Sequence, residues 1–254
     1  SNYRSNSAIK KTKIMTTLAR ITIAFIFAIF LSSCAFDIDF GQGTKGNGVV
    51  TTDERPITGE FTVVSASEGL DVYVTQANDF EIKVEADENV IDLIATDIKG
   101  GKLTIHSIEN IGRATKKIYV SLPEITGLYA SSGADLIANN NIEADKITIN
   151  ASSGSNVKAE ITADEASVDT SSGAGIRLSG EALSLNADAS SGANINAKNL
   201  KVQNCKANAS SGADISINVS ESLVADASSG ANIGYTGEAS LQAKKSVSGS
   251  VHKN

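Results

Sequence analysis

The chain has 254 residues, of which 5% are aromatic and none is tryptophan, so its small side chains favour stacked strands over a bulky core. The formal net charge is −7, and the chain from residue 34 onward is more acidic still, with 17 basic against 29 acidic side chains. This acidity argues against nucleic acid as a partner, because phosphate binding requires a positive surface.

The segment from Met15 to Ser33 has the order of a secretory signal peptide. Arg20 provides a positive start, residues 21–31 form an apolar run, and the residues that follow are small. The run is shorter than the roughly 20 apolar residues of a transmembrane helix. Residues 1–33 are therefore predicted to be a signal peptide with an upstream extension, both removed from the mature protein.

The quartet Leu31-Ser32-Ser33-Cys34 resembles the lipobox of bacterial lipoproteins, in which cleavage precedes a cysteine that is then lipidated. The alternative is an ordinary signal peptide with a chance cysteine. The resemblance implies that Cys34 is the mature N-terminus and anchors the protein in a membrane, since several acyl chains on one residue bind stably. With Ala35 next to it, an outer-membrane lipoprotein of the cell envelope is expected, facing the periplasm or the surface.

The next two regions are predicted to be a tether and a β-rich module. Residues 34–47 are short and glycine-rich, and their G-x-G-x-x-G spacing lacks the strand and helix that a dinucleotide site requires. Residues 48–123 alternate apolar and polar side chains, as strands do, and form a non-repeating module. The clearest runs are EFTVVSAS, LDVYVTQ, FEIKVEAD, KLTIHSI and KKIYVSLP.

Residues 124–251 are built from a repeat with the motif SSG. Its glycines are separated by 18 to 21 residues, at positions 133, 154, 173, 192, 212, 230 and 249. Such regular self-similarity is the signature of a solenoid. We expect about seven coils of about 19 residues, each too poor in apolar side chains to fold without its neighbours.

Comparison of the repeats assigns the side chains to two faces. Residues at odd offsets from the glycine are aliphatic or small, and residues at even offsets are polar, so the repeat has the period of a strand. In DASSGANI, Ala189, Ala193 and Ile195 are predicted to face inward, and Asp188 and Asn194 outward. A leucine-rich repeat would need a helical half, and a flexible linker would not keep an aliphatic residue at one offset.

No catalytic residue and no cofactor is predicted. The serines recur in every coil while the two histidines do not, so the serines lack a base and are interpreted as turn or ladder residues. Cys205 occupies an inward offset, which predicts a buried cysteine without a disulfide partner. One polar column, two residues after the glycine, is a candidate ligand-binding ladder: Asp135, Asn156, Asn194, Asp214 and Asn232.

A second outward column places Asp169 and Asp188 about 5 Å apart on neighbouring coils. Carboxylates at this distance repel one another unless they are screened by solvent or bridged by a hard cation such as Ca²⁺. The calcium-binding pattern G-G-x-G-x-D is absent, so screened surface carboxylates are favoured and no metal site is assigned.

The order of these segments resembles the head GIN domain family, described as auto-transporter adhesins and common in Bacteroidetes. The resemblance rests on RPITGEFTVVSASEGLDVYVTQ, KLTIHS and the coils ASSGADL and ASSGANI, and covers residues 48–251. It implies a right-handed parallel β-helix outside the cytoplasm and carries over no catalytic residue.

We therefore predict a non-enzymatic, lipid-anchored envelope protein that presents a β-helical surface for adhesion or ligand binding. Its expected partners are the membrane, through Cys34, and a glycan or a surface protein. Two alternatives are kept: an enzyme acting on polysaccharides, which would need a cluster of acids or bases in one coil, and an envelope structural or lipid-binding protein.

Overall fold

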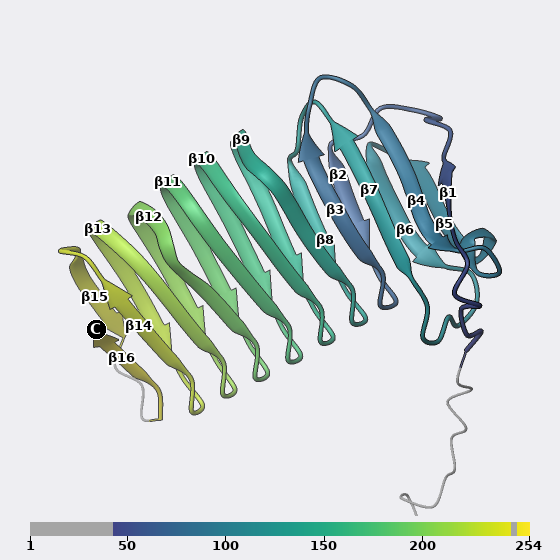
Figure 1. The fold of residues 1–254 in the computed structure, drawn as a ribbon. Helices are drawn as coiled ribbons and strands as arrows, with labels where there is room; N and C mark the ends of the chain where they lie inside the picture. Colours follow the sequence, from purple (N-terminus) through teal and green to yellow (C-terminus); the bar gives the residue numbers. More distant parts are fainter. Residues whose placement is uncertain (1–42, 245–247) are drawn as a thin grey trace, which may run out of the picture. The chain divides into compact units, whose positions relative to one another are not determined.

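The computed structural model describes residues 43–244 and 248–254, and Figure 1 shows them as a row of stacked strands. Cys34 and the predicted signal peptide lie outside these residues. The strands are β1 (Val50–Glu54), β2 (Val63–Ala66), β3 (Asp71–Gln76), β4 (Glu81–Asp87), β5 (Ile94–Lys99), β6 (Lys102–Ser107), β7 (Lys116–Leu122), β8 (Gly127–Ala130), β9 (Asp135–Ala151), β10 (Asn156–Thr170), β11 (Gly175–Ala189), β12 (Asn194–Ala209), β13 (Asp214–Ala227), β14 (Asn232–Thr236), β15 (Ser240–Lys244) and β16 (Ser250–Lys253). Within residues 43–244 and 248–254, the one helical element is the 3-10 turn η2 (Ile91–Leu93).

The repeats form a parallel β-solenoid, which confirms the predicted fold class. Strands β9 to β13 pair in parallel, each with the next, so that one strand is one coil. The SSG-type repeats give about six turns, slightly fewer than the seven predicted. At the C-terminal end, β14, β15 and β16 pair along only parts of the preceding coil.

Each long strand consists of two straight legs that meet at a corner. In β10, buried and exposed side chains alternate up to Ala163, and the alternation changes phase at Asp164 and Glu165, which are both exposed. The first leg covers residues 156–163 and the second 165–170, and both turn their apolar side chains inward. A coil therefore has two outer faces, one on each leg, and a corner edge between them.

Each SSG triplet forms a tight turn whose two central residues are the second serine and the glycine. The turn connects the second leg of one coil to the first leg of the next. Ser191 has a φ of 53° and Gly192 a φ of 70°, and the Ala193 N–H donates to the Ser190 carbonyl at 3.1 Å. Positive φ at both central residues, together with this bond, defines a type I′ turn. Ser191 lies at the tip of this turn and is consequently exposed.

The turns are also joined to one another along the solenoid axis. The N–H of Gly192 donates to the carbonyl of Ser211 in the next coil at 3.0 Å. An equivalent bond from the glycine N–H joins each of the other turns to the next coil. In these turns the serine directly before the glycine has a left-handed backbone. These serines are Ser132, Ser153, Ser172, Ser191, Ser211 and Ser229.

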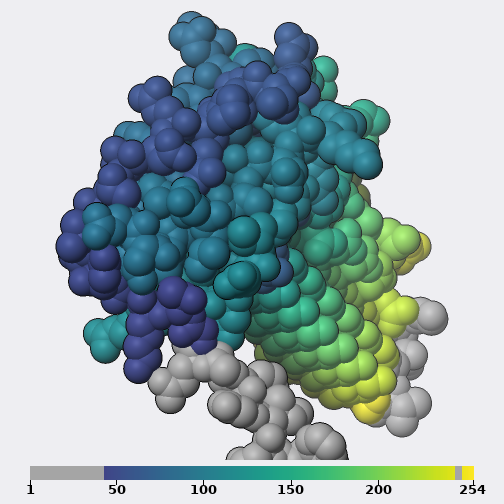
Figure 2. Space-filling view, turned by 90° about the vertical axis from the view of Figure 1, so that its right-hand side faces the viewer, coloured from purple at the N-terminus to yellow at the C-terminus, as the bar shows by residue number. Residues whose placement is uncertain are grey.

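The interior is a single column of stacked apolar side chains. Ala189, Ala193 and Ile195 are at most 4% exposed, as predicted, and Cys205 is equally buried. Parallel register places like residues above one another, for example Ile176 on Ile195 and Ile195 on Ile215. In the space-filling view the coils form regular parallel rows without large protrusions (Figure 2).

Two further coils come from residues that were predicted to form a non-repeating module. Strands β2 and β3 pair in parallel with β8 and β9, with Val64 in register with Leu128 and Val72 with Leu136. Their turn contains Glu68 and Gly69, both with positive φ, and the Gly69 N–H donates to the Ser132 carbonyl at 3.0 Å. The first turn of this kind in the chain is therefore Ser67-Glu68-Gly69, in which a glutamate replaces the second serine of the SSG triplet.

The next coil outward is formed by β6 and β7, which pair in parallel with β2 and β3. The spatial order of the coils is thus β6/β7, then β2/β3, then β8/β9, and differs from the chain order. Strand β5 pairs antiparallel with β6, β4 with β7, and β1 with β4. These antiparallel strands cover the N-terminal end of the solenoid, where a further parallel coil would otherwise add.

The last residues of the predicted tether, 43–47, are bound to this N-terminal cover. The Thr44 N–H donates to the Asn110 carbonyl at 2.9 Å, and the Gly46 N–H donates to the Arg113 carbonyl at 3.0 Å. Gly46 packs directly against the carboxylate of Asp87, where a Cβ atom would overlap it. Gly43 and Gly46, two of the glycines in the G-x-G-x-x-G spacing, thus allow close backbone approach.

Thr170 departs from the apolar pattern of the interior and offers a test of the packing. Thr170 is 4% exposed, lies in register with Ala151 and Ala189, and its hydroxyl has no hydrogen-bond partner in the described part of the chain. Because Thr170→Val keeps the branched shape and removes the unpaired hydroxyl, it is expected to stabilise the protein by about 1–2 kcal/mol. A higher midpoint of urea unfolding would show this. Thr170→Ser, which keeps the hydroxyl and loses the methyl group, should lower the midpoint, and a less stable valine variant would contradict the prediction.

Candidate binding surface

The predicted ligand ladder is present as a column on the outer face of the first legs. The first residues of β9, β10, β12, β13 and β14 belong to it, and adjacent members are cross-strand partners. Asn156 donates from Nδ2 to Asp135 Oδ1 at 2.8 Å, and Asn232 donates in the same way to Asp214 Oδ1 at 3.0 Å. Amide and carboxylate therefore alternate as donor and acceptor. We call these residues the Asp/Asn column: Asp135, Asn156, Asn194, Asp214 and Asn232.

The Asp/Asn column is interrupted at β11, where Gly175 takes the place of a side chain. Gly175 is in register with Asn156 on one side and Asn194 on the other. The missing side chain contributes to a groove of about 440 Å³ that Asn156, Asn194 and Asn196 line together with Lys158 and Arg177. We call Lys158 and Arg177 the basic pair.

The basic pair was not singled out from the sequence. Lys158 and Arg177 are cross-strand partners on β10 and β11, and both are exposed. Neighbouring parallel strands are about 4.8 Å apart, so two positive charges lie side by side. The sequence signal was available, since both residues occupy the fourth position after an SSG glycine, where the other coils have Ile137, Asn196, Ser216, Gly234 and, in the last coil, Lys253.

Asp169 and Asp188 are brought together on the outer face of the second legs, as the repeat register predicts. They are cross-strand partners, and Asn208 donates from Nδ2 to Asp188 Oδ1 at 2.7 Å. Burial, and then the charge of Asp188, raise the pKa of Asp169. Both carboxylates line a groove of about 490 Å³ with Asn150, Asn208 and Asp226. Among the described residues, no group of three or more His, Cys, Asp or Glu side chains is arranged to hold a metal ion.

The raised pKa of Asp169 has a consequence for stability. A carboxyl group whose pKa is higher in the folded state stabilises the fold when protonated, and this contribution is lost as the pH rises through the folded pKa. Asp169→Asn is therefore expected to raise stability at pH 7 by about 0.2–1 kcal/mol, with an amide that can donate to Asp188. Thermal midpoints of both proteins should converge below about pH 4. An unchanged midpoint at pH 7, or a rise of the wild-type midpoint alone in millimolar calcium, would indicate a bridged pair instead.

The stacked tyrosines of β3 and β7 do not form an open platform. Tyr73 and Tyr119 are cross-strand partners, and their rings stack with centroids 5.2 Å apart and planes 18° apart. The ammonium group of Lys83 lies 5.2 Å from the centroid of the Tyr119 ring. Because these ring faces contact each other and a cation, they are not open for a sugar to stack upon.

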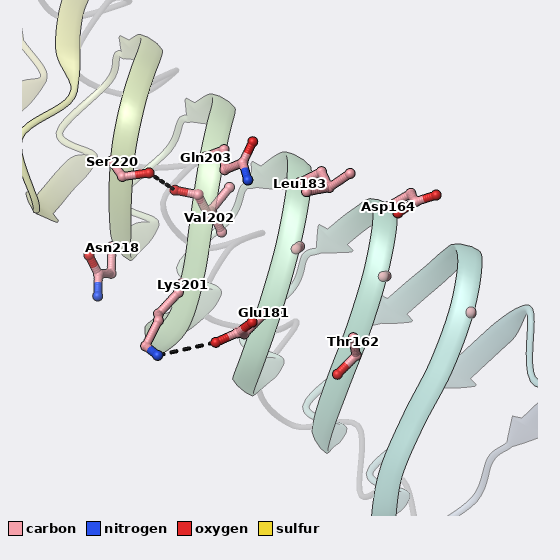
Figure 3. A pocket seen from close by; sticks show the side chains of 12 residues that line it. Thr162, Asp164, Glu181, Leu183, Lys201, Val202, Gln203, Asn218 and Ser220 are labelled. Atoms are coloured by element: carbon pink, nitrogen blue, oxygen red, sulfur yellow. Dashed lines mark hydrogen bonds and ion pairs between the residues drawn. The ribbon is translucent and has the colours of Figure 1, made fainter.

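The corner edge carries a third groove, of about 470 Å³, which Figure 3 shows. Leu183 is 48% exposed there, between the polar corner residues Asp164 and Gln203. Lys201 Nζ lies 3.1 Å from Glu181 Oε1, so the cation at this edge is already paired. The corner groove thus combines one apolar side chain with a neutralised ion pair.

The groups with reactive potential are in structural roles. Burial raises the pKa of the Cys205 thiol to about 12, so the thiol is protonated and unreactive at neutral pH. A hydrogen bond to Asp97 at 2.8 Å raises the pKa of His106. The second serine of each triplet is at the tip of a turn, where its backbone conformation is the feature that the fold uses.

The chain is similar to known proteins in family and in structure. The family described as "Putative auto-transporter adhesin, head GIN domain" matches residues 60–239. No curated protein sequence matches the chain. In residues 43–244 and 248–254, no helix has the length and apolar character of a membrane span.

Solved structures of similar fold come from Bacteroidetes. A "putative adhesin" from Bacteroides fragilis NCTC 9343 has a TM-score of 0.75 at 21% identity, over 84% of this chain and 100% of that chain. A "putative adhesin" from Parabacteroides merdae ATCC 43184 has a TM-score of 0.68 at 21% identity, over 84% and 99%. A "putative lipid binding protein" from Parabacteroides distasonis ATCC 8503 has a TM-score of 0.68 at 21% identity, over 83% and 98%.

At these identities the structures establish the fold, and the family match carries the relationship. The match extends along the chain from just before β2 to the residue before β15. The chain belongs to the head GIN domain family.

Proposed function

We propose that the chain is a non-enzymatic, lipid-anchored protein of the bacterial outer membrane whose β-solenoid acts as an adhesin. Cys34 is the anchor in this proposal, and the outer faces of the two legs are the binding surfaces. Their partners are glycans or surface proteins that offer many hydroxyl and amide groups. The family description and the "putative adhesin" relatives support this assignment.

The observation that carries the proposal is the regular spacing of the outward polar columns. The Asp/Asn column repeats in every coil from β9 to β14 except β11, where Gly175 interrupts it, and it is held in register by parallel pairing and by the bonds between turns. Repeated groups about 4.8 Å apart on a rigid support suit repetitive partners, because several weak contacts act together. The interior is filled with apolar side chains, so these columns are what the solenoid displays.

The test uses cells that lack their own copy of the gene and carry the full chain or its Cys34→Ser variant. Cells with the wild-type chain are expected to bind immobilised mucin several-fold more than cells without it. The Cys34→Ser chain should be recovered in the soluble fraction and should give no adhesion. Protease treatment of intact cells should cut the wild-type chain. A chain that stays intact in whole cells, with adhesion unchanged by its deletion, would exclude the adhesin function.

A further inference from the structure

We infer that the groove at the basic pair binds an isolated carboxylate of an otherwise neutral glycan. This inference rests on the proposed adhesin function and names the ligand class of one part of its surface. The groove lies over Gly175 on the first-leg face, with Lys158 and Arg177 beside it and Asn156 and Asn194 at its two ends.

The first argument is that this arrangement departs from the charge pattern of the other coils. At three other places in the solenoid a lysine lies beside a carboxylate: Lys146 lies 2.9 Å from Glu165, Lys201 lies 3.1 Å from Glu181, and Lys253 lies 3.0 Å from Glu238. Lys158 and Arg177 face each other instead, and neither makes an ion pair within the described residues. Like charges directly opposite one another destabilise a sheet, so the fold gains nothing from this pair.

The second argument is that the missing side chain at Gly175 provides space at the same place. Gly175 is not in the left-handed region, and a Cβ atom there would meet the Asn156 side-chain oxygen at 3.0 Å. The backbone therefore does not require glycine. An asparagine would fill the gap and continue the Asp/Asn column from Asn156 to Asn194, as in the other coils.

The third argument concerns the kind of anion. The chain as a whole is acidic, so a polyanion is repelled by most of its surface while a single carboxylate is attracted locally. Guanidinium and ammonium groups side by side bind the two oxygens of one carboxylate. Asn156, Asn194 and Asn196 offer both donors and acceptors to the hydroxyl groups of adjoining sugars. The corner groove lacks this attraction because its lysine is paired with Glu181 (Figure 3).

The test measures binding to the full chain, purified in detergent, by isothermal titration calorimetry with 3′-sialyllactose and with lactose. The wild-type chain is expected to bind 3′-sialyllactose and not lactose. The double variant Lys158→Gln/Arg177→Gln should bind at least about tenfold more weakly, since each lost charged hydrogen bond costs about that factor. Gly175→Asn, which fills the groove and keeps both cations, should weaken binding to a similar extent. Lys206→Gln, which removes an exposed cation on the other face, is the matched control and should bind like the wild type.

Three results would overturn the inference. Equal binding of lactose would show that the carboxylate is not recognised. Binding of inorganic phosphate as tight as that of 3′-sialyllactose would show a general anion site. Unchanged or absent binding of 3′-sialyllactose across all variants would exclude this groove. Mucin adhesion of cells carrying the double variant separates the two proposals: adhesion equal to wild type would exclude the groove and leave the adhesin function standing.

Discussion

Replacing Gly180 with alanine is expected to destabilise the solenoid by about 3 kcal/mol or more. Gly180 has a φ of 105°, a backbone conformation that side chains strongly disfavour. It is also in register with Ile161 on the preceding coil, and a Cβ atom at Gly180 would overlap the Ile161 carbonyl oxygen. Backbone atoms of a paired strand cannot move aside without loss of the pairing. The effect should appear as a lower midpoint of urea unfolding.

Gly192→Ala is the matched control for this prediction. Gly192 also has a positive φ, of 70°, but no atom lies within 4 Å of the position that a Cβ would occupy. Its substitution should therefore cost only the backbone strain, about 1 kcal/mol. If the two variants had equal midpoints, strain at positive φ alone would explain both, and the clash at the Ile161 carbonyl would be excluded.

The coils after residue 124 were predictable because their fold is local and periodic. Each SSG triplet recurs at nearly constant spacing, so odd and even offsets could be compared across repeats without a structure. That comparison correctly placed Ile195 inside and Asn194 outside. The contact between Asp169 and Asp188 followed from the same register. The repeats did not reveal the turn type, which required the φ angles of Ser191 and Gly192.

The N-terminal coils were missed because the pairing there does not follow the chain. Strands β6 and β7 lie beyond β2 and β3, although they come later in the sequence. Self-similarity along the chain cannot show such an order. The turn at Glu68 and Gly69 left a weaker signal, since SASEGLDV matches YASSGADL in its apolar positions. The loss of one serine was sufficient to hide it.

The basic pair was missed for a different reason. Lys158 and Arg177 lie in two different coils. A single exposed cation in a strand is ordinarily a solvated residue, so neither stood out in its own coil. Their meaning depends on two facts that only the register supplies: they are neighbours, and Gly175 leaves a gap beside them. A candidate site of this kind is an interruption in a repeat. The features that the repeats share therefore do not indicate it.

The second large effect is expected at Asp87, which holds the first described residues to the N-terminal cover. Its side chain is 2% exposed and accepts hydrogen bonds from the N–H groups of Gly48 and Thr115, both at 2.6 Å. Asp87→Ala would leave both donors without this partner in a partly buried place and would empty the space of a buried side chain, and each lost hydrogen bond of this kind costs about 1–3 kcal/mol. We expect a loss of about 3 kcal/mol, visible as a lower thermal midpoint.

The position of Asp87 also links this prediction to the proposed anchoring. In the proposed function the chain is anchored in the membrane through Cys34. A pulling force between the membrane and a surface bound to the solenoid therefore acts on residues 43–48. The backbone hydrogen bonds of Thr44 and Gly46 and the hydrogen bond from Gly48 to Asp87 resist that force. Limited proteolysis should therefore cut Asp87→Ala within residues 43–49 well before the coils. Asp87→Asn keeps the shape and one acceptor, and should fall between wild type and Asp87→Ala in both measurements. Equal protease resistance of wild type and Asp87→Ala would show that the backbone bonds alone hold this segment.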